Sequence, residues 1–170
     1  MEDFVERLRS AQIERLVDVR KIPRSAFNPQ FNTDTLPASL VESAISYEHV
    51  DALGGRRGKA RGVPSDVNAF WTHESFHNYA DYALSLAFRT ALTHLIETGR
   101  QQRCAIMCSE AVWWRCHRRI IADYLLAWGE AVFHIMGPDR LEPARLTDGA
   151  NVQPDRTIVY PAEQRSLFQE

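Results

Sequence analysis

The side chains best suited to covalent chemistry are gathered between residues 108 and 119. Cys108, Ser109 and Glu110 follow an apolar run, and a helical pattern begins close behind them. A thiol at the junction of a strand and a helix lies near unpaired backbone N–H groups and the positive end of the helix dipole, which both favour the thiolate. We therefore predict that Cys108 is a nucleophile and that Glu110 is a carboxyl group able to exchange protons.

Cys116, His117 and Arg118 lie about two turns further along the same helical pattern. We include all three among the predicted ligand-binding residues. On a helix, adjacent side chains point about 100° apart, so Cys116 and His117 are not expected to face one small site equally well. The spacing of Cys108, Cys116 and His117 is not typical of zinc sites, and we predict no metal there. The alternative for each cysteine, above all Cys104, is a small buried apolar side chain.

A glycine-rich basic segment forms a second candidate site. Residues 53–62 contain four cations, four glycines and no acid. Backbone amides of glycine loops and arginine forks both bind phosphate oxygens, although the segment lacks the spacing of a Walker loop. We therefore predict that Gly54, Gly55, Arg56 and Arg57 bind a phosphate-bearing small molecule or a nucleic acid. The alternative is a solvated, flexible loop.

A third pattern, His73-Glu74-Ser75-Phe76-His77, matches the helical zinc-hydrolase motif, in which two histidines hold zinc and the glutamate activates water. A third ligand is missing. Glu97 would lie about 30 Å from His77 along a continuous helix. The alternative for these residues is a set of exposed polar side chains at the start of a helix.

The elements that must position these residues alternate between helices and strands. The patterns predict helices at about 1–12, 33–44, 72–98 and 111–128, and strands at 16–20, 45–47, 104–108, 131–135 and 157–160. Such alternation predicts a three-layer α/β domain, with a mostly parallel, Rossmann-like sheet and helices on both faces. Ligands bind at the carboxyl ends of the strands in such sheets. We therefore add Asp18 to the predicted catalytic residues, and Arg20 and His49 to the predicted ligand-binding residues.

The composition limits the class of protein. The chain has 170 residues, and we expect one domain with a helix at 1–14, a core at 15–160 and a tail at 161–170. With 45% apolar residues, 25% charged residues and a net charge of -2, it is neither disordered nor basic overall. The three cysteines, and the absence of a signal pattern and of a long apolar run, predict a cytoplasmic protein without a disulfide framework or membrane segment. No pattern in the sequence identifies a cofactor, and the sequence is compatible with an oligomer.

Several short segments together resemble the domain of unknown function family 488. The most specific are the Asp-x-Arg strand and the paired Cys-x-Glu and Cys-His-Arg segments. The full set is Leu16 to Arg20, Pro23, Ser25, Tyr47, His49, Leu53 to Gly55, Trp71, Phe76, Tyr79, Cys108 to Glu110 and Cys116 to Arg118. The resemblance covers about residues 15–160. It implies an α/β domain of bacteria and archaea and supplies no activity.

The sequence thus predicts a protein that binds or acts on a phosphate-bearing ligand, a nucleotide or nucleic acid, through a Cys/Glu/Arg site. One alternative is a non-catalytic nucleic-acid-binding module, in which the basic loop and the nearby Asn68, Phe70 and Trp71 contact backbone and bases. The other is a zinc-dependent hydrolase that uses His73, Glu74 and His77.

Overall fold

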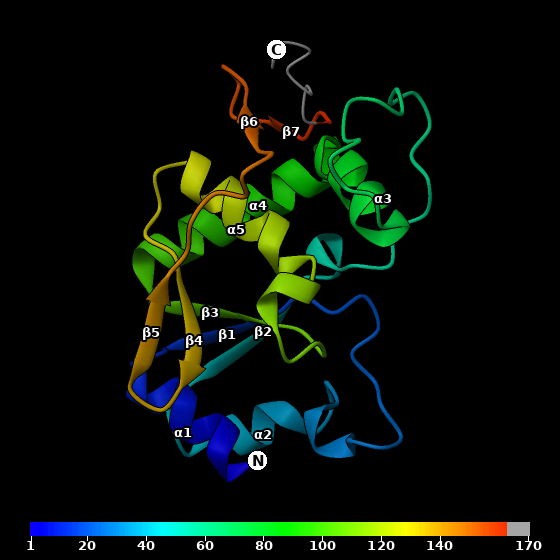
Figure 1. Ribbon diagram of the computed structural model, residues 1–170. Helices are drawn as coiled ribbons and strands as arrows, with labels where there is room; N and C mark the ends of the chain where they lie inside the picture. The colour runs from blue at the N-terminus through cyan, green and yellow to red at the C-terminus, as the bar shows by residue number, and fades with distance from the viewer. Residues whose placement is uncertain (163–170) are drawn as a thin grey trace, which may run out of the picture.

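A three-stranded parallel sheet lies at the centre of the computed structural model, which describes residues 1–162 (Figure 1). Its strands are β1 (Arg15–Asp18), β2 (Ser46–His49) and β3 (Cys104–Met107), in the order β2-β1-β3. Asp18 pairs with His49 on one side and with Met107 on the other. The carboxyl ends of all three strands therefore meet at one edge of the sheet.

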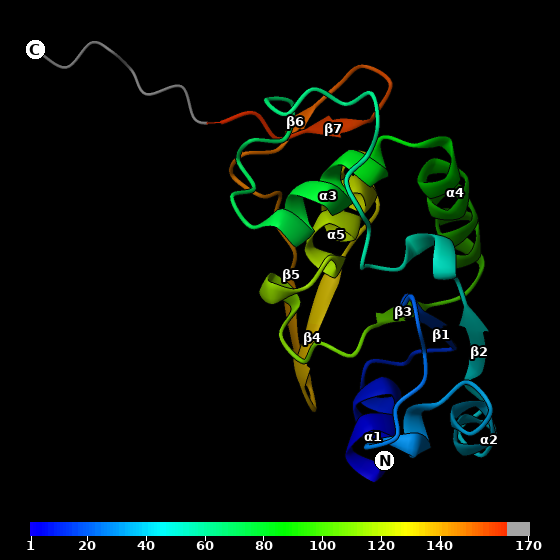
Figure 2. The same cartoon turned by 90° about the vertical axis from the view of Figure 1, so that its right-hand side faces the viewer.

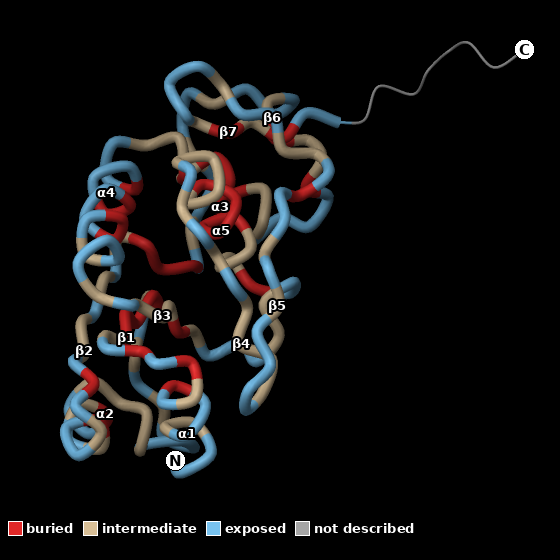
Figure 3. The backbone as a smooth tube through the Cα atoms, turned by 90° about the vertical axis from the view of Figure 1, so that its left-hand side faces the viewer, coloured by how far each residue is buried: buried red, intermediate tan, exposed pale blue. Residues whose placement is uncertain are grey.

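Helices pack on both faces of this sheet, as Figures 1 and 2 show. Because side chains alternate along a strand, Leu16 and Val17 enter different cores. Leu16 packs with the first two helices and Val17 with the other three, whose inner sides are buried in Figure 3. The helices are α1 (Glu2–Ser10), α2 (Leu36–Val41), α3 (Glu74–Ala83), α4 (Leu86–Gln101) and α5 (Arg118–Ala127).

The later strands form two antiparallel pairs. β4 (Phe133–Gly137) pairs with β5 (Arg140–Pro143), and β6 (Asn151–Val152) pairs with β7 (Ile158–Val159). The strand predicted at 131–135 thus forms a hairpin and does not extend the parallel sheet, because the chain reverses at Asp139, which has a φ of 55°. The sheet is smaller than the predicted Rossmann-like one, and β3 is left at its edge.

Two predicted helices differ from the observed ones. The helix predicted at 72–98 is divided into α3 and α4 by Ser85, whose extended backbone and side-chain hydroxyl cap the N-terminus of α4. The helix predicted at 111–128 begins only at Arg118. A short 3-10 turn, η3 (Trp113–Arg115), precedes it, and Cys116 is extended, with φ -127° and ψ 148°.

Two further 3-10 turns, η1 (Pro29–Phe31) and η2 (Asp51–Leu53), follow β1 and β2. Most of the predicted tail at 161–170 lies outside the described residues. Within residues 1–162, no helix has the length and apolar character needed to span a membrane.

Candidate thiol site

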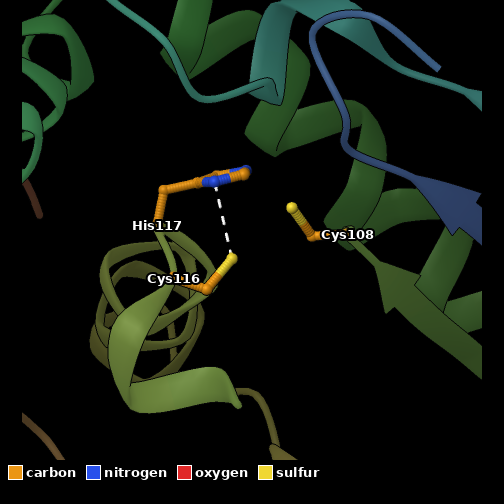
Figure 4. Close-up of side chains that lie close together, drawn as sticks. All are labelled: Cys108, Cys116 and His117. Carbon is orange, nitrogen blue, oxygen red and sulfur yellow. Dashed lines mark hydrogen bonds between the residues drawn. The ribbon is translucent and has the colours of Figure 1, made fainter. Parts of the chain in front are cut away.

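Two thiols and an imidazole converge where β3 ends and α5 begins. Cys108 follows β3 directly, and Cys116 and His117 precede α5. Their sulfur and nitrogen atoms all lie within 4.8 Å of one another, and Figure 4 shows Cys108 pointing toward the other two. Cys116 is buried, whereas Cys108 and His117 are half-buried. The site is thus covered on one side and accessible at Cys108.

The non-helical backbone before α5 makes this convergence possible. The prediction that Cys116 and His117 cannot share a small site assumed helical geometry at both residues. Cys116 is extended instead, so the angle of about 100° between adjacent helical side chains does not apply. The prediction is therefore wrong, and both side chains reach Cys108.

The imidazole of His117 is fixed from several sides. Its Nε2 atom lies 3.1 Å from the backbone oxygen of Val19, and its Nδ1 atom lies 3.6 Å from Sγ of Cys116. A carbonyl oxygen only accepts hydrogen bonds, so Nε2 carries the proton in this contact. The ring centroid also lies 4.8 Å from that of buried Tyr79. Nδ1 is therefore the ring nitrogen that faces the thiols.

Gly54 and Gly55 bring the segment after β2 against this site. A Cβ atom on Gly55 would lie 2.8 Å from Nδ1 of His117, and one on Gly54 would lie 2.8 Å from the backbone of Lys21. Neither position has room for a side chain. These contacts give both glycines a packing role that is independent of phosphate binding.

The two thiols have opposite electrostatic environments. The pKa of Cys108 is lowered to about 3, first by a hydrogen bond from Cys116 and then, against the effect of burial, by His117 and the backbone N–H of Glu110. The same hydrogen bond and burial raise the pKa of Cys116. Burial also raises the pKa of Cys104. With the pKa of Cys108 lowered and that of Cys116 raised, Cys108 is the thiol that more readily becomes a thiolate.

Arg118 connects the Cys-Ser-Glu turn to α5. Its Nε atom donates to Sγ of Cys116 at 3.3 Å, and a terminal nitrogen donates to the backbone oxygen of Glu110. The exposed carboxylate of Glu110 accepts from the backbone N–H of Val112 at 3.2 Å. Glu110 therefore lies at the surface beside the thiols, with its backbone fixed and its carboxylate open to solvent.

Asp18 and Arg20 form a separate buried cluster. Nε of Arg20 donates to Oδ1 of Asp18 at 2.8 Å, the hydroxyl of Tyr47 donates to Asp18 at 2.7 Å, and Arg20 also donates to the backbone oxygen of Phe31. Nε2 of His49 lies 2.8 Å from the backbone oxygen of Arg20.

This cluster lies on the other face of the sheet from the thiols. Asp18 shares the face of Leu16, whereas Cys108 packs in the core that contains Val17. The structure therefore does not bring Asp18 or Arg20 to Cys108. Their side chains are occupied by contacts within the fold, and the catalytic role of Asp18 and the ligand-binding role of Arg20 stay predictions.

In the basic loop, Arg57 is engaged with its own chain. Its guanidinium donates to the backbone oxygens of Gly54, Asp51 and Ala52 and lies 3.8 Å from the ring centroid of Tyr82. Arg56 is exposed, with a φ of 57°. The guanidinium of Arg57 is thus occupied by its own chain, and the ligand-binding role of both arginines stays a prediction.

The aromatic residues after this loop face inward. Trp71 is only 7% exposed and stacks on Phe76 with centroids 4.9 Å apart, and Asn68 is buried and donates to Asp81. Phe70 is half-buried and packs edge-on against Trp71. Their packing supports the core and leaves little ring surface for bases.

The two histidines of the alternative zinc site, His73 at the N-cap of α3 and His77 within α3, make other contacts. Nδ1 of His73 accepts from the backbone N–H of Ser75 at the start of α3, and Nε2 of His77 lies 3.6 Å from Asp81. Within residues 1–162, Cys108, Cys116 and His117 are the one group of three metal-binding side chains that converges. Thiolates, and an imidazole held by a carbonyl, are donors that zinc accepts, so these three residues are the ones that can hold a metal.

Comparison with known proteins supports the resemblance seen in the sequence. The family model described as "Domain of unknown function DUF488" matches residues 1–125. No curated protein and no solved structure matches the chain. The matched range contains the parallel sheet and all three residues of the thiol site, whereas β4 to β7 lie beyond it.

Proposed function

The chain belongs to the DUF488 family, and we propose that it is a thiol-dependent enzyme in which Cys108 attacks a phosphate ester. The observation that carries the proposal is the convergence of Cys108, Cys116 and His117 within 4.8 Å at the carboxyl end of β3. A nucleophilic cysteine needs a polar, partly exposed environment that favours its thiolate. The half-buried Cys108, with a thiol donor and a backbone N–H beside it, has that environment.

The charge around the thiols supports an anionic substrate. Arg118 touches Cys116, and it belongs to a segment, residues 111–122, that contains three arginines and no acid. His117, whose Nδ1 atom faces the thiols, is the N-cap of α5, so the positive end of this ten-residue helix lies next to the site. Helix N-termini and arginines are the groups that most often hold phosphate oxygens in proteins.

The proposed reaction has two steps. The thiolate of Cys108 attacks phosphorus, an S–P bond forms, and the P–O bond to the leaving group breaks. The leaving oxygen takes a proton from water, with exposed Glu110 as the carboxylate that mediates the transfer. Water then attacks phosphorus, the S–P bond breaks, and phosphate leaves as the thiolate is restored. Throughout, the Cys116 thiol stabilises the Cys108 sulfur, and His117 holds the position of both.

The proposal is tested by alkylation and by hydrolysis of p-nitrophenyl phosphate. With iodoacetamide and mass spectrometry, Cys108 is expected to react with a midpoint well below the ordinary thiol pKa of about 8.5, and before Cys104. Hydrolysis is expected to be lost in Cys108→Ser and kept in Cys104→Ser. The proposal is overturned if Cys108 reacts no faster than Cys104 at pH 6, if the wild-type protein does not hydrolyse the ester, or if purified protein carries one zinc per chain.

A further inference from the structure

A large cavity lies between the free edge of β3, the helices α4 and α5, and the β4–β5 hairpin. Its volume is about 840 Å³, and residues from all of these elements line it. Cavities of roughly 300–1,000 Å³ are typical of small-molecule sites. The cavity exists because β4 turns onto β5 and does not pair with β3. The same departure from the predicted sheet thus creates room for a ligand.

Aromatic rings form part of the cavity wall. The rings of Trp113 and His134 are stacked, with centroids 3.9 Å apart and planes 4° from parallel. Trp114 stands at 89° to Trp113 and is 46% exposed. Exposed tryptophan faces stack on nucleobases. This wall suits a planar aromatic group.

Cations dominate the polar part of the wall. Four arginines line the cavity, Arg7, Arg100, Arg103 and Arg118, against one acid, Glu130. Glu130 pairs with Arg100 at 2.6 Å, so the charge that remains is positive. Arg7 and Arg103 are exposed; Arg7 donates to the backbone oxygen of Met136, and Arg103 donates to the backbone oxygen of Ala11 and to the side-chain oxygen of Gln12. Guanidinium groups in such settings bind phosphate oxygens.

One residue joins this cavity to the thiol site. Arg118 lines the cavity, and its guanidinium donates to Sγ of Cys116. From the volume, the aromatic wall and the excess of arginines, we infer that the cavity binds a mononucleotide. The inference rests on the proposed function, for which it names the class of substrate. A cavity of this size encloses one nucleotide, which favours a mononucleotide over a nucleic-acid strand.

Binding is measured by titration calorimetry on Cys108→Ser, so that turnover does not interfere. The probes are AMP, adenosine, inorganic phosphate and a ten-residue oligothymidylate. AMP is expected to bind at least about tenfold more tightly than adenosine or phosphate, because only AMP uses both the aromatic and the basic wall. Trp114→Ala is expected to weaken AMP binding by about tenfold. Phe27→Ala removes a 95% exposed ring outside the cavity and is expected to leave AMP binding unchanged.

The contribution of the positively charged cavity wall to AMP binding is tested with two arginines of α1. Arg7 lines the cavity and Arg9 does not, although both are exposed on the same helix. Arg7→Glu is expected to weaken AMP binding by about fivefold or more, and Arg9→Glu to leave it unchanged. Equal effects in the two variants, or no binding of AMP, overturn the inference. Binding of the oligonucleotide alone, weakening steeply with salt, also overturns it in favour of a nucleic-acid surface.

Failure of this inference is distinct from failure of the proposed function. If AMP does not bind while Cys108 is reactive and p-nitrophenyl phosphate is hydrolysed, the nucleotide site is wrong and the enzymatic proposal stands. If AMP binds with the expected variant effects while Cys108 is inert, the nucleotide site stands and the thiol mechanism is wrong.

Discussion

The Nε2 atom of His117 lies 3.1 Å from the backbone oxygen of Val19, directly after β1. This contact joins the start of α5 to the end of the central strand. It also orients the imidazole, because the Nε2 proton is used by the carbonyl and Nδ1 is left facing the Cys116 thiol. The position of one ring therefore depends on β1, on α5 and on the glycines packed against it.

The first prediction concerns the space beside that ring. Gly55→Ala places a Cβ atom 2.8 Å from Nδ1 of His117, so the imidazole must move. We expect hydrolysis of the phosphate ester to fall by about tenfold to a hundredfold, as misplaced catalytic groups commonly cause. The matched control is Gly58→Ala in the same loop, because nothing lies within 4 Å of the added Cβ atom. Equal rates in the two variants would show that the position of His117 is unimportant.

The second prediction concerns the effect of Cys116 on the pKa of Cys108. Cys116→Ala removes the hydrogen bond that contributes most to the lowered pKa of Cys108. The midpoint of Cys108 alkylation is expected to rise by about one to two pH units, the value of one hydrogen bond to a charged group. Cys116→Ser keeps a donor, and its midpoint should lie nearer to that of the wild type. An unchanged midpoint in Cys116→Ala would contradict the assignment.

The direction in which Cys108 alkylation changes with pH follows from the same contacts. A thiol with a lowered pKa loses its thiolate only as the pH falls toward about 3. Alkylation of Cys108 should therefore be nearly constant between about pH 5 and 8, whereas an ordinary thiol becomes about tenfold more reactive for each unit over that range. Cys104, whose pKa is raised by burial, provides the comparison within the same protein.

The strands of the central sheet could be predicted from sequence because their patterns are local. β1 and β3 are short apolar runs, and the observed strands overlap the predicted ones, with ends that differ by no more than two residues. The end of β3 then places Cys108 by chain order alone. What the sequence did not reveal is the pairing of β4, because the apolar run at 131–135 fits a parallel strand and a hairpin equally well.

The convergence of the thiols could not be predicted because it depends on where α5 begins. The apolar pattern continues from Ala111 into the helix, and it conceals the 3-10 turn at Trp113. One signal was present, since valine and tryptophan have low helix propensity and Val112, Trp113 and Trp114 are consecutive. The cavity beside Trp113 was missed because the pairing of β4 with β5 was not predicted.

The third prediction concerns the buried ion pair at the end of β1. Asp18 is fully buried, and Asp18→Ala leaves the Arg20 guanidinium, only 7% exposed, without its carboxylate. We expect a loss of about 3–5 kcal/mol in the free energy of unfolding, measured by urea denaturation. The control is Asp34→Ala, which breaks an exposed pair with Arg24 and should cost less than about 1 kcal/mol. If Asp18→Ala keeps its stability but loses activity, Asp18 is catalytic after all.

The fourth prediction separates the two arginines of the basic loop. Arg57 donates to three backbone oxygens, so Arg57→Ala leaves these acceptors unpaired and should lower the free energy of unfolding by about 1–3 kcal/mol. Arg56 is exposed, so Arg56→Ala should change the free energy of unfolding by less than about 0.5 kcal/mol. The measurement is again urea denaturation. A stable Arg57→Ala variant that no longer binds inorganic phosphate would instead make Arg57 a ligand-binding residue, because its backbone contacts would then contribute little to the fold.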